Sequence, residues 1–155
     1  MNAGRTHYVT GIDPVADVFD TGKSSDIVNM KLWNHVEFIL WWGVGATGTQ
    51  TITVEACDDV VPTNTSAIPF LSRSIPGGTN VPTALTRRAA AGFTTTAGSS
   101  QIIICEVDAE MLDASGYGFV RLTTVEVVNS PVLGGILIRL SEPRQAIAVY
   151  DAAIA

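Results

Sequence analysis

The sequence predicts a single-domain, all-β protein folded as a sandwich or a barrel. From residue 27 onward, short runs rich in β-branched and aromatic residues are separated by clusters of Gly, Pro, Asn and Asp. Apolar and polar residues alternate along several runs, as they do in strands with one buried face. No long segment has helical spacing, and a chain of 155 residues can bury a core of its own.

About seven or eight strands are expected. They correspond to residues 27–33, 35–42, 49–57, 67–73, 101–108, 117–128 and 132–140, with a weaker run near 91–96. In the second run, Val36, Phe38, Leu40 and Trp42 share one face, which we expect to be buried. The run at 132–140 is apolar on both faces apart from Arg139, so it is expected to be central or at an interface.

The region with predicted strands is flanked by two segments whose residue patterns differ from it. The first is turn-rich and follows neither apolar period, and the last is mostly apolar and is expected to dock on this subunit or a neighbour. The expected organisation is an extended N-terminal arm at 1–26, a sandwich at 27–142 and a C-terminal tail at 143–155. Two short helices are also expected, at 83–91 and, with Asp108 as N-cap, at 109–114.

Charge limits the classes of partner. Fifteen acidic residues against nine basic ones give a net charge of −6, so the chain lacks the basic surface that nucleic acids or anionic membranes require. No secretory signal or membrane-spanning run is apparent, which predicts a protein made in the cytosol. Charged residues make up only 15% of the chain, so we expect part of its surface to be covered by partners.

Three glycines, Gly43, Gly45 and Gly48, match the dinucleotide-binding spacing G-x-G-x-x-G. That motif needs a helix after the glycines, whereas the residues from Thr49 onward alternate with period two and are β-branched. We therefore expect the glycines to turn a hairpin between the strands at 35–42 and 49–57. No cofactor is predicted.

No catalytic site is predicted, and the chain is not expected to be an enzyme. His35 and Cys57 could face each other in one hairpin register, but that register also sets Glu37 against Glu55. The register shifted by two avoids this clash and places His35 opposite Glu55. Cys57 is expected on an outer face and Cys105 on an inner one, so a disulfide between them is not expected.

No zinc-ligand spacing is present, and no metal is predicted. The acids of "CDD" at 57–59 and "DAEMLD" at 108–113 could supply calcium ligands if their loops met. Turn and capping roles are the commoner use of such acids.

Among the tryptophans, neighbouring Trp41 and Trp42 must point to opposite faces of one strand. Trp42 is expected in the core, and Trp41 is a candidate anchor for another chain or a rim residue covered by the arm.

Three stretches resemble a family of small structural proteins of tailed bacteriophages, the head decoration or cement proteins. They are "TITVEACDDVVPTNTSAIPF", "GFTTTAGSSQIIICEVDAEMLDASGYGFVRL" and "VNSPVLGGILIRLSEPR". The resemblance spans about residues 27 to 145 and is most specific at "VEACDD", at "EVDA" and at "NSPVLGG" with the following "LSEPR". It implies a jelly-roll-like β-sandwich that assembles, as a trimer, on the outside of the capsid shell and bridges subunits of the major capsid protein.

The expected location is therefore the virion surface, after synthesis in the host cytoplasm. The residues expected to contact capsid or a neighbouring copy are apolar ones on the strand face, the arm and the tail: Tyr8, Val9, Ile39, Trp41, Ile147, Val149 and Tyr150. The alternative is a phage fibre, tail or glycan-binding module. It would use Trp41 as an aromatic platform and Asp58 and Asp59 as calcium ligands.

Overall fold

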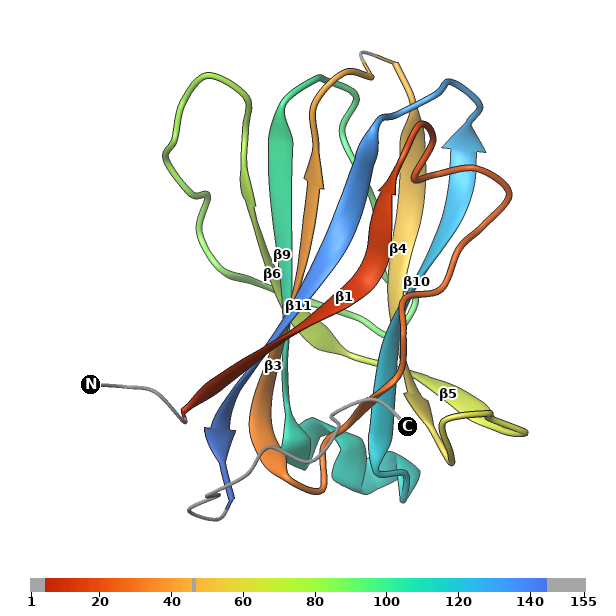
Figure 1. The fold of residues 1–155 in the computed structure, drawn as a ribbon, viewed down its shortest axis with the longest axis vertical. Helices are drawn as coiled ribbons and strands as arrows, with labels where there is room; N and C mark the ends of the chain where they lie inside the picture. Colours follow the sequence, from red (N-terminus) through yellow and green to blue (C-terminus); the bar gives the residue numbers. More distant parts are fainter. Residues whose placement is uncertain (1–4, 46, 145–155) are drawn as a thin grey trace.

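A computed structural model of the chain describes residues 5–45 and 47–144, which form two antiparallel sheets packed face to face (Figure 1). The larger sheet has the order β1 (Thr6–Val15), β11 (Gly134–Pro143), β3 (Trp33–Trp42), β9 (Gln101–Asp108), β6 (Phe70–Ile75) and β7 (Thr86–Arg88). The smaller has the order β2 (Val28–Asn29), β10 (Phe119–Val128), β4 (Thr49–Cys57) and β5 (Thr65–Ile68), and β8 (Phe93–Thr94) also pairs with β4.

The predicted all-β sandwich is confirmed. The described residues contain eleven strands rather than the seven or eight expected, because β1 and β7 lie outside the expected runs and the run at 67–73 is divided between β5 and β6. The run expected at 27–33 contains β2, which covers only Val28–Asn29, and strands as short as β2 and β7 have too few residues to show an alternating pattern in the sequence. The core lies between the sheets, where alternate residues of each strand are buried, among them Val36, Phe38, Leu40, Trp42, Ile52, Val54, Val107, Leu122 and Ile138.

The predicted hairpin between residues 35–42 and 49–57 is wrong. Strand β3 pairs with β11 and β9, and β4 pairs with β10, so the Gly43–Gly48 segment carries the chain from one sheet to the other. His35 consequently lies opposite Ser141 and Asp108, not Glu55. Alternation predicted which side chains are buried, and it fits equally well when two strands face each other across a core.

The prediction of an extended N-terminal arm outside the sandwich is also corrected. Residues 6–15 form the edge strand β1, paired with β11, and the segment after it enters the core. Val18 and Phe19 are only 3% and 0% exposed, and the Phe19 ring lies edge-on to Trp42 at 5.4 Å between centroids. The sequence did not predict strand β1, because its pairing with β11 is irregular between Thr10 and Val15 and interrupts the alternation of buried and exposed residues. Most of the predicted tail, residues 145–155, lies outside the described residues.

The two predicted helices have different outcomes. Residues 109–114 fall in the 3-10 helix η1 (Ala109–Ser115) with Asp108 at the N-cap, but the Asp108 side chain makes no cap hydrogen bond. Residues 83–91 are not helical and contain β7. The run expected at 67–73 divides at Pro69, where the chain leaves β5 in the smaller sheet and enters β6 in the larger.

Candidate interaction face

The outer face of the larger sheet carries an apolar patch that the strand register assembles from three strands. Trp41 of β3 lies opposite Gly135 of β11 and Ile102 of β9. Two residues along, Ile39 lies opposite Leu137 and Ile104. A groove of about 550 Å³ runs beside Trp41, and we call it the Trp41 groove. Its apolar lining includes Ile12, Ile39, Trp41, Ile102, Leu133 and Leu137.

Gly135 of β11 leaves the Trp41 ring uncovered on that side. A Cβ at Gly135 would lie 2.9 Å from the Ile12 carbonyl oxygen and 3.1 Å from the Pro14 nitrogen, so β1 packs too closely here for a side chain. Without a side chain at Gly135, nothing from the neighbouring β11 position lies against the indole. Trp41 remains 67% exposed, and Leu133 and Leu137 are 50% and 41% exposed.

Toward the other end of the same face, the side chains are charged. We call this set the charged ladder, and it comprises His35, Glu37, Arg73, Glu106, Asp108 and Arg139. Glu37 lies directly opposite Glu106, which would be unfavourable alone. Arg73 bridges the two, with Nη2 at 3.0 Å from Glu106 Oε1 and 3.7 Å from Glu37 Oε1. On the β11 side, Arg139 Nη1 donates to Glu37 Oε2 at 2.6 Å.

His35 completes the charged ladder between two carboxylates. Its Nδ1 donates to Asp108 Oδ1 at 2.6 Å, and its Nε2 lies 3.9 Å from Glu37 Oε1. Interaction with Glu37 and then Asp108 raises the pKa of His35 to about 9, although burial opposes this. The same contact with His35, aided by Arg139, lowers the pKa of Glu37 to about 2. At neutral pH the imidazole is therefore a cation and is not available as a general base.

Ligand atoms of His35, Glu37 and Glu106 all lie within 4.8 Å of one another, which is a spacing that a metal ion could use. The donor set does not fit a resident metal. Arg73 already bridges the two glutamates, Arg139 holds the second oxygen of Glu37, and the imidazole carries a proton. An ion would have to displace these cations, so the charged ladder is best described as a network of ion pairs.

The residues predicted to contact a partner do not form one surface in the structure. Trp41 and Ile39 lie together in the Trp41 groove, and Tyr8 is 57% exposed on β1 opposite Arg139. The prediction that Val9 contacts a partner is corrected, because Val9 points into the core and is only 7% exposed. Ile147, Val149 and Tyr150 lie outside the described residues. Trp42 is buried as predicted, and its indole Nε1–H donates to the Gly98 carbonyl at 2.8 Å.

His35 and Cys57 do not form a nucleophile–base pair, because they belong to different sheets. Cys57 was expected on an outer face but is fully buried, and burial raises its thiol pKa to about 11. A thiol with this pKa is almost entirely protonated at neutral pH. Cys105 is buried as well, and both cysteines are free.

The loop acids have local structural roles. Asp58 accepts hydrogen bonds from the backbone and side chains of Thr63 and Asn64, which close the turn between β4 and β5 and lower the Asp58 pKa to about 2. Among the described residues, neither "CDD" nor "DAEMLD" contributes to a cluster with metal-ligand spacing. Trp41 and Asp58 also lie at opposite ends of the sandwich, because β3 ends where β4 begins (Figure 1).

Sequence reasoning identified Trp41 and Ile39 but missed most of the Trp41 groove. Ile102, Leu133 and Leu137 come from distant segments, and only the β11–β3–β9 pairing brings them together. One signal was available, since the run at 132–140 is apolar on both faces. The charged ladder had no such signal in the sequence.

The chain matches no protein-family model and no curated protein at a significant level. Within the described residues, no helix has both the length and the apolarity that crossing a membrane requires.

Proposed function

We propose that this chain is a structural virion protein that binds the outer surface of a tailed-phage head and bridges capsid subunits. The proposal starts from the resemblance over residues 27 to 145 to head decoration proteins. The observation that carries it is the 67% exposed Trp41 in an apolar groove on the outer sheet face. Exposed apolar patches of this kind mark interaction sites, and tryptophan is a frequent hot spot of protein interfaces.

Charge on this face favours association. The charged ladder holds three cations, with His35 protonated, and three carboxylates, so it is neutral within a chain of net charge −6. Most of the net negative charge therefore lies elsewhere on the surface. A second acidic molecule can approach the neutral face with less repulsion than it meets elsewhere.

The mechanism is the addition of weak contacts. The protein associates with itself, as a trimer, and each copy offers one Trp41 groove to a capsid subunit. Once the first contact forms, the next ones are intramolecular, so several weak interfaces together hold the shell firmly. A closed ring also uses the same heterologous interface repeatedly.

Trp41→Ala tests this proposal by co-sedimentation with purified empty capsids and by native mass spectrometry of the free protein. Loss of a tryptophan hot spot of about 2 kcal/mol weakens each contact roughly thirtyfold. The matched control is Val127→Ala, which removes an exposed apolar side chain from β10 in the other sheet. A monomer that does not bind capsids, or equal binding by both variants, contradicts the proposal.

The glycan-binding alternative has less support. Among the described residues that line the Trp41 groove, the Thr10 hydroxyl and the Trp41 indole N–H are the polar side-chain groups, whereas sugars need several hydrogen-bonding partners. Asp58, its proposed calcium ligand, is engaged with its own loop. Calcium-dependent binding of the free protein to a glycan array, with no affinity for capsids, would favour this alternative instead.

A further inference from the structure

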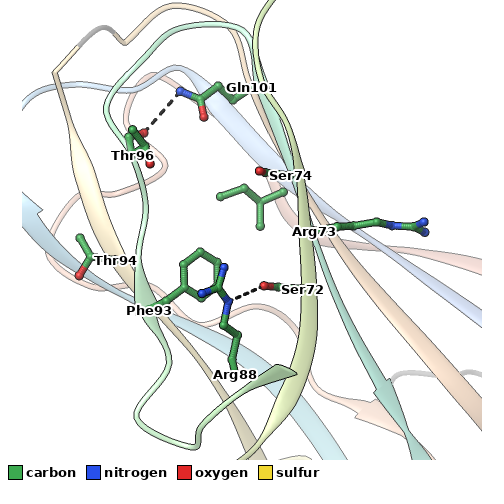
Figure 2. A pocket seen from close by; sticks show the side chains of 9 residues that line it. Ser72, Arg73, Ser74, Arg88, Phe93, Thr94, Thr96 and Gln101 are labelled. Atoms are coloured by element: carbon green, nitrogen blue, oxygen red, sulfur yellow. Dashed lines mark hydrogen bonds between the residues drawn. The ribbon is translucent and has the colours of Figure 1, made fainter. Parts of the chain in front are cut away.

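A second cavity, of about 290 Å³, opens between the two sheets beside β6 (Figure 2). Strand β6 forms one wall and residues 93–96 form the other. Arg88 and Phe93 lie at one end, whereas Arg73 points away to the outer face, and Ile103 also lines the cavity. We call this cavity the Arg88 pocket.

Arg88 is held in place by two contacts. Its Nε–H donates to Ser72 Oγ at 2.8 Å, and its guanidinium carbon lies 4.2 Å from the centre of the Phe93 ring (Figure 2). Ser72 is only 1% exposed, so this anchor belongs to the interior of the fold. A guanidinium has five N–H donors, and the bond to Ser72 uses one of them. The terminal nitrogens are thus fixed in position while keeping donors for another molecule.

No carboxylate of the described residues pairs with Arg88. Arg73, Arg121 and Arg139 each pair with a glutamate at 3.0 Å or less, although acids outnumber bases in the chain by fifteen to nine. A partly buried cation is usually balanced by an anion, because desolvation disfavours a charge that has no partner. Arg88 is stabilised by the face of an aromatic ring and a hydroxyl, neither of which carries a negative charge.

Other groups around the Arg88 pocket can bind a polar ligand. Gln101 Nε2 donates one N–H to the Thr96 carbonyl, which leaves its second N–H as a donor (Figure 2). Next to the pocket, Gln50 is fully buried and neither atom of its side-chain amide has a hydrogen-bond partner. The Gln50 backbone exchanges hydrogen bonds with Thr95, whose two neighbours line the pocket. This edge of the interior therefore has unused hydrogen-bonding capacity.

We propose that the Arg88 pocket binds a carboxylate, with the terminal nitrogens of Arg88 as the donors. A planar carboxylate matches the fork of a guanidinium, and the side chains of Phe93 and Ile103 can contact a short apolar stem. The carboxylate can come from a small organic acid or from an acidic side chain of another protein. The site is separate from the Trp41 groove and does not depend on the proposed virion function.

The test is a titration of the folded protein with sodium acetate at constant ionic strength, followed by the backbone amide NMR signals of Ser72, Ser74 and Ile103. Acetamide, which is similar in shape but neutral, is the ligand control. We expect saturable shifts with acetate, with a Kd on the order of millimolar, and none with acetamide. Arg88→Gln should weaken acetate binding about tenfold or more, because it removes the bidentate donor.

Arg87→Gln is the matched control, since it removes the same charge from the exposed neighbour of Arg88 on β7. It should leave the affinity within about twofold, because rim charges contribute little. If Arg88→Gln unfolds the protein, Ser74→Leu gives an independent test by filling the pocket, and it should also abolish the shifts. Non-saturable shifts, or equal effects of the Arg88 and Arg87 variants, overturn the proposal.

A second titration identifies the source of the carboxylate. Acetyl-Asp-amide carries the same group on a peptide backbone. Saturation by both probes supports a site that an acidic side chain of a partner can enter. Saturation by acetate alone supports a site for small acids, and saturation by neither probe overturns the proposal.

Discussion

At the residue scale, neighbouring charges determine what each ionisable group does. Glu37 has a like charge directly opposite it in Glu106, which sequence reasoning would reject as a pairing. The pairing is tolerated because Arg139 approaches Glu37 from the neighbouring strand β11, and Arg73 approaches it from β6, which lies beyond β9. His35, which as a lone strand histidine could be a general base, is instead a cation held by Glu37 and Asp108.

The charged ladder should make stability depend on pH at both extremes. The pKa of His35 rises from 6.5 to about 9 on folding, so its contribution is full below pH 6.5 and is lost as pH rises through 9. The pKa of Glu37 falls from 4.5 to about 2, so its contribution is present above pH 4.5 and is lost as pH falls toward 2. The imidazole is 19% exposed, and the alkaline loss is on the order of 2–3 kcal/mol.

Urea denaturation from pH 6 to pH 10 measures this loss. His35→Gln should flatten the decrease in unfolding free energy between pH 6.5 and 9, because the variant has no imidazole to deprotonate. If the unfolding free energy of the variant decreases as steeply with pH as that of the wild type, groups other than His35 cause the loss of stability at alkaline pH. An NMR titration of the imidazole in the wild-type protein gives the His35 pKa directly.

At the element scale, the Gly43–Gly48 segment crosses between sheets and packs against the chain leading into β11. A Cβ at Gly48 would lie 2.4 Å from the Ser130 carbonyl oxygen and 2.6 Å from Val132 Cγ2. The glycine at this position permits a close approach of two backbones. Nothing at this position indicates a nucleotide site, since a strand and not a helix follows the glycines.

Gly48→Ala should therefore destabilise the protein by about 1–3 kcal/mol, because a backbone oxygen has to move. Gly43→Ala is the matched control, since a Cβ there meets no atom within 4 Å. That variant should stay within about 0.5 kcal/mol of the wild type. Chemical denaturation of both variants measures the difference in unfolding free energy. Equal stability would show that the backbone near Gly48 can move away from Ser130 without cost.

At the scale of the whole molecule, the first of the two terminal segments is part of the folded sandwich. The first contributes strand β1 and the buried side chains of Val18 and Phe19. Its removal would leave β11 as an unpaired edge and open the core beside Trp42. The last, residues 145–155, follows the final strand of the larger sheet.

Deleting residues 1–25 should prevent folding or sharply lower the Tm, because the loss of Phe19 alone amounts to about 3–5 kcal/mol. Deleting 145–155 should weaken self-association and capsid binding, because under the proposed function Ile147, Val149 and Tyr150 contact a neighbouring copy or the capsid. Thermal unfolding and native mass spectrometry separate the two effects. A stable protein without residues 1–25, or full capsid binding without the tail, would contradict this division.

The sequence by itself determined the all-β class, the buried face of β3, the burial of Trp42 and the position of Trp41 on the opposite face of that strand. These follow from the period of two, which is a local property. Only the tertiary structure decided that β3 and β4 lie in different sheets and that β1 belongs to the larger one. It also decided that Glu37 meets Glu106 and that Arg88 lies over Phe93. Alternation determines which side of a strand is buried, whereas the choice of strand neighbours depends on packing between segments that are distant in the sequence.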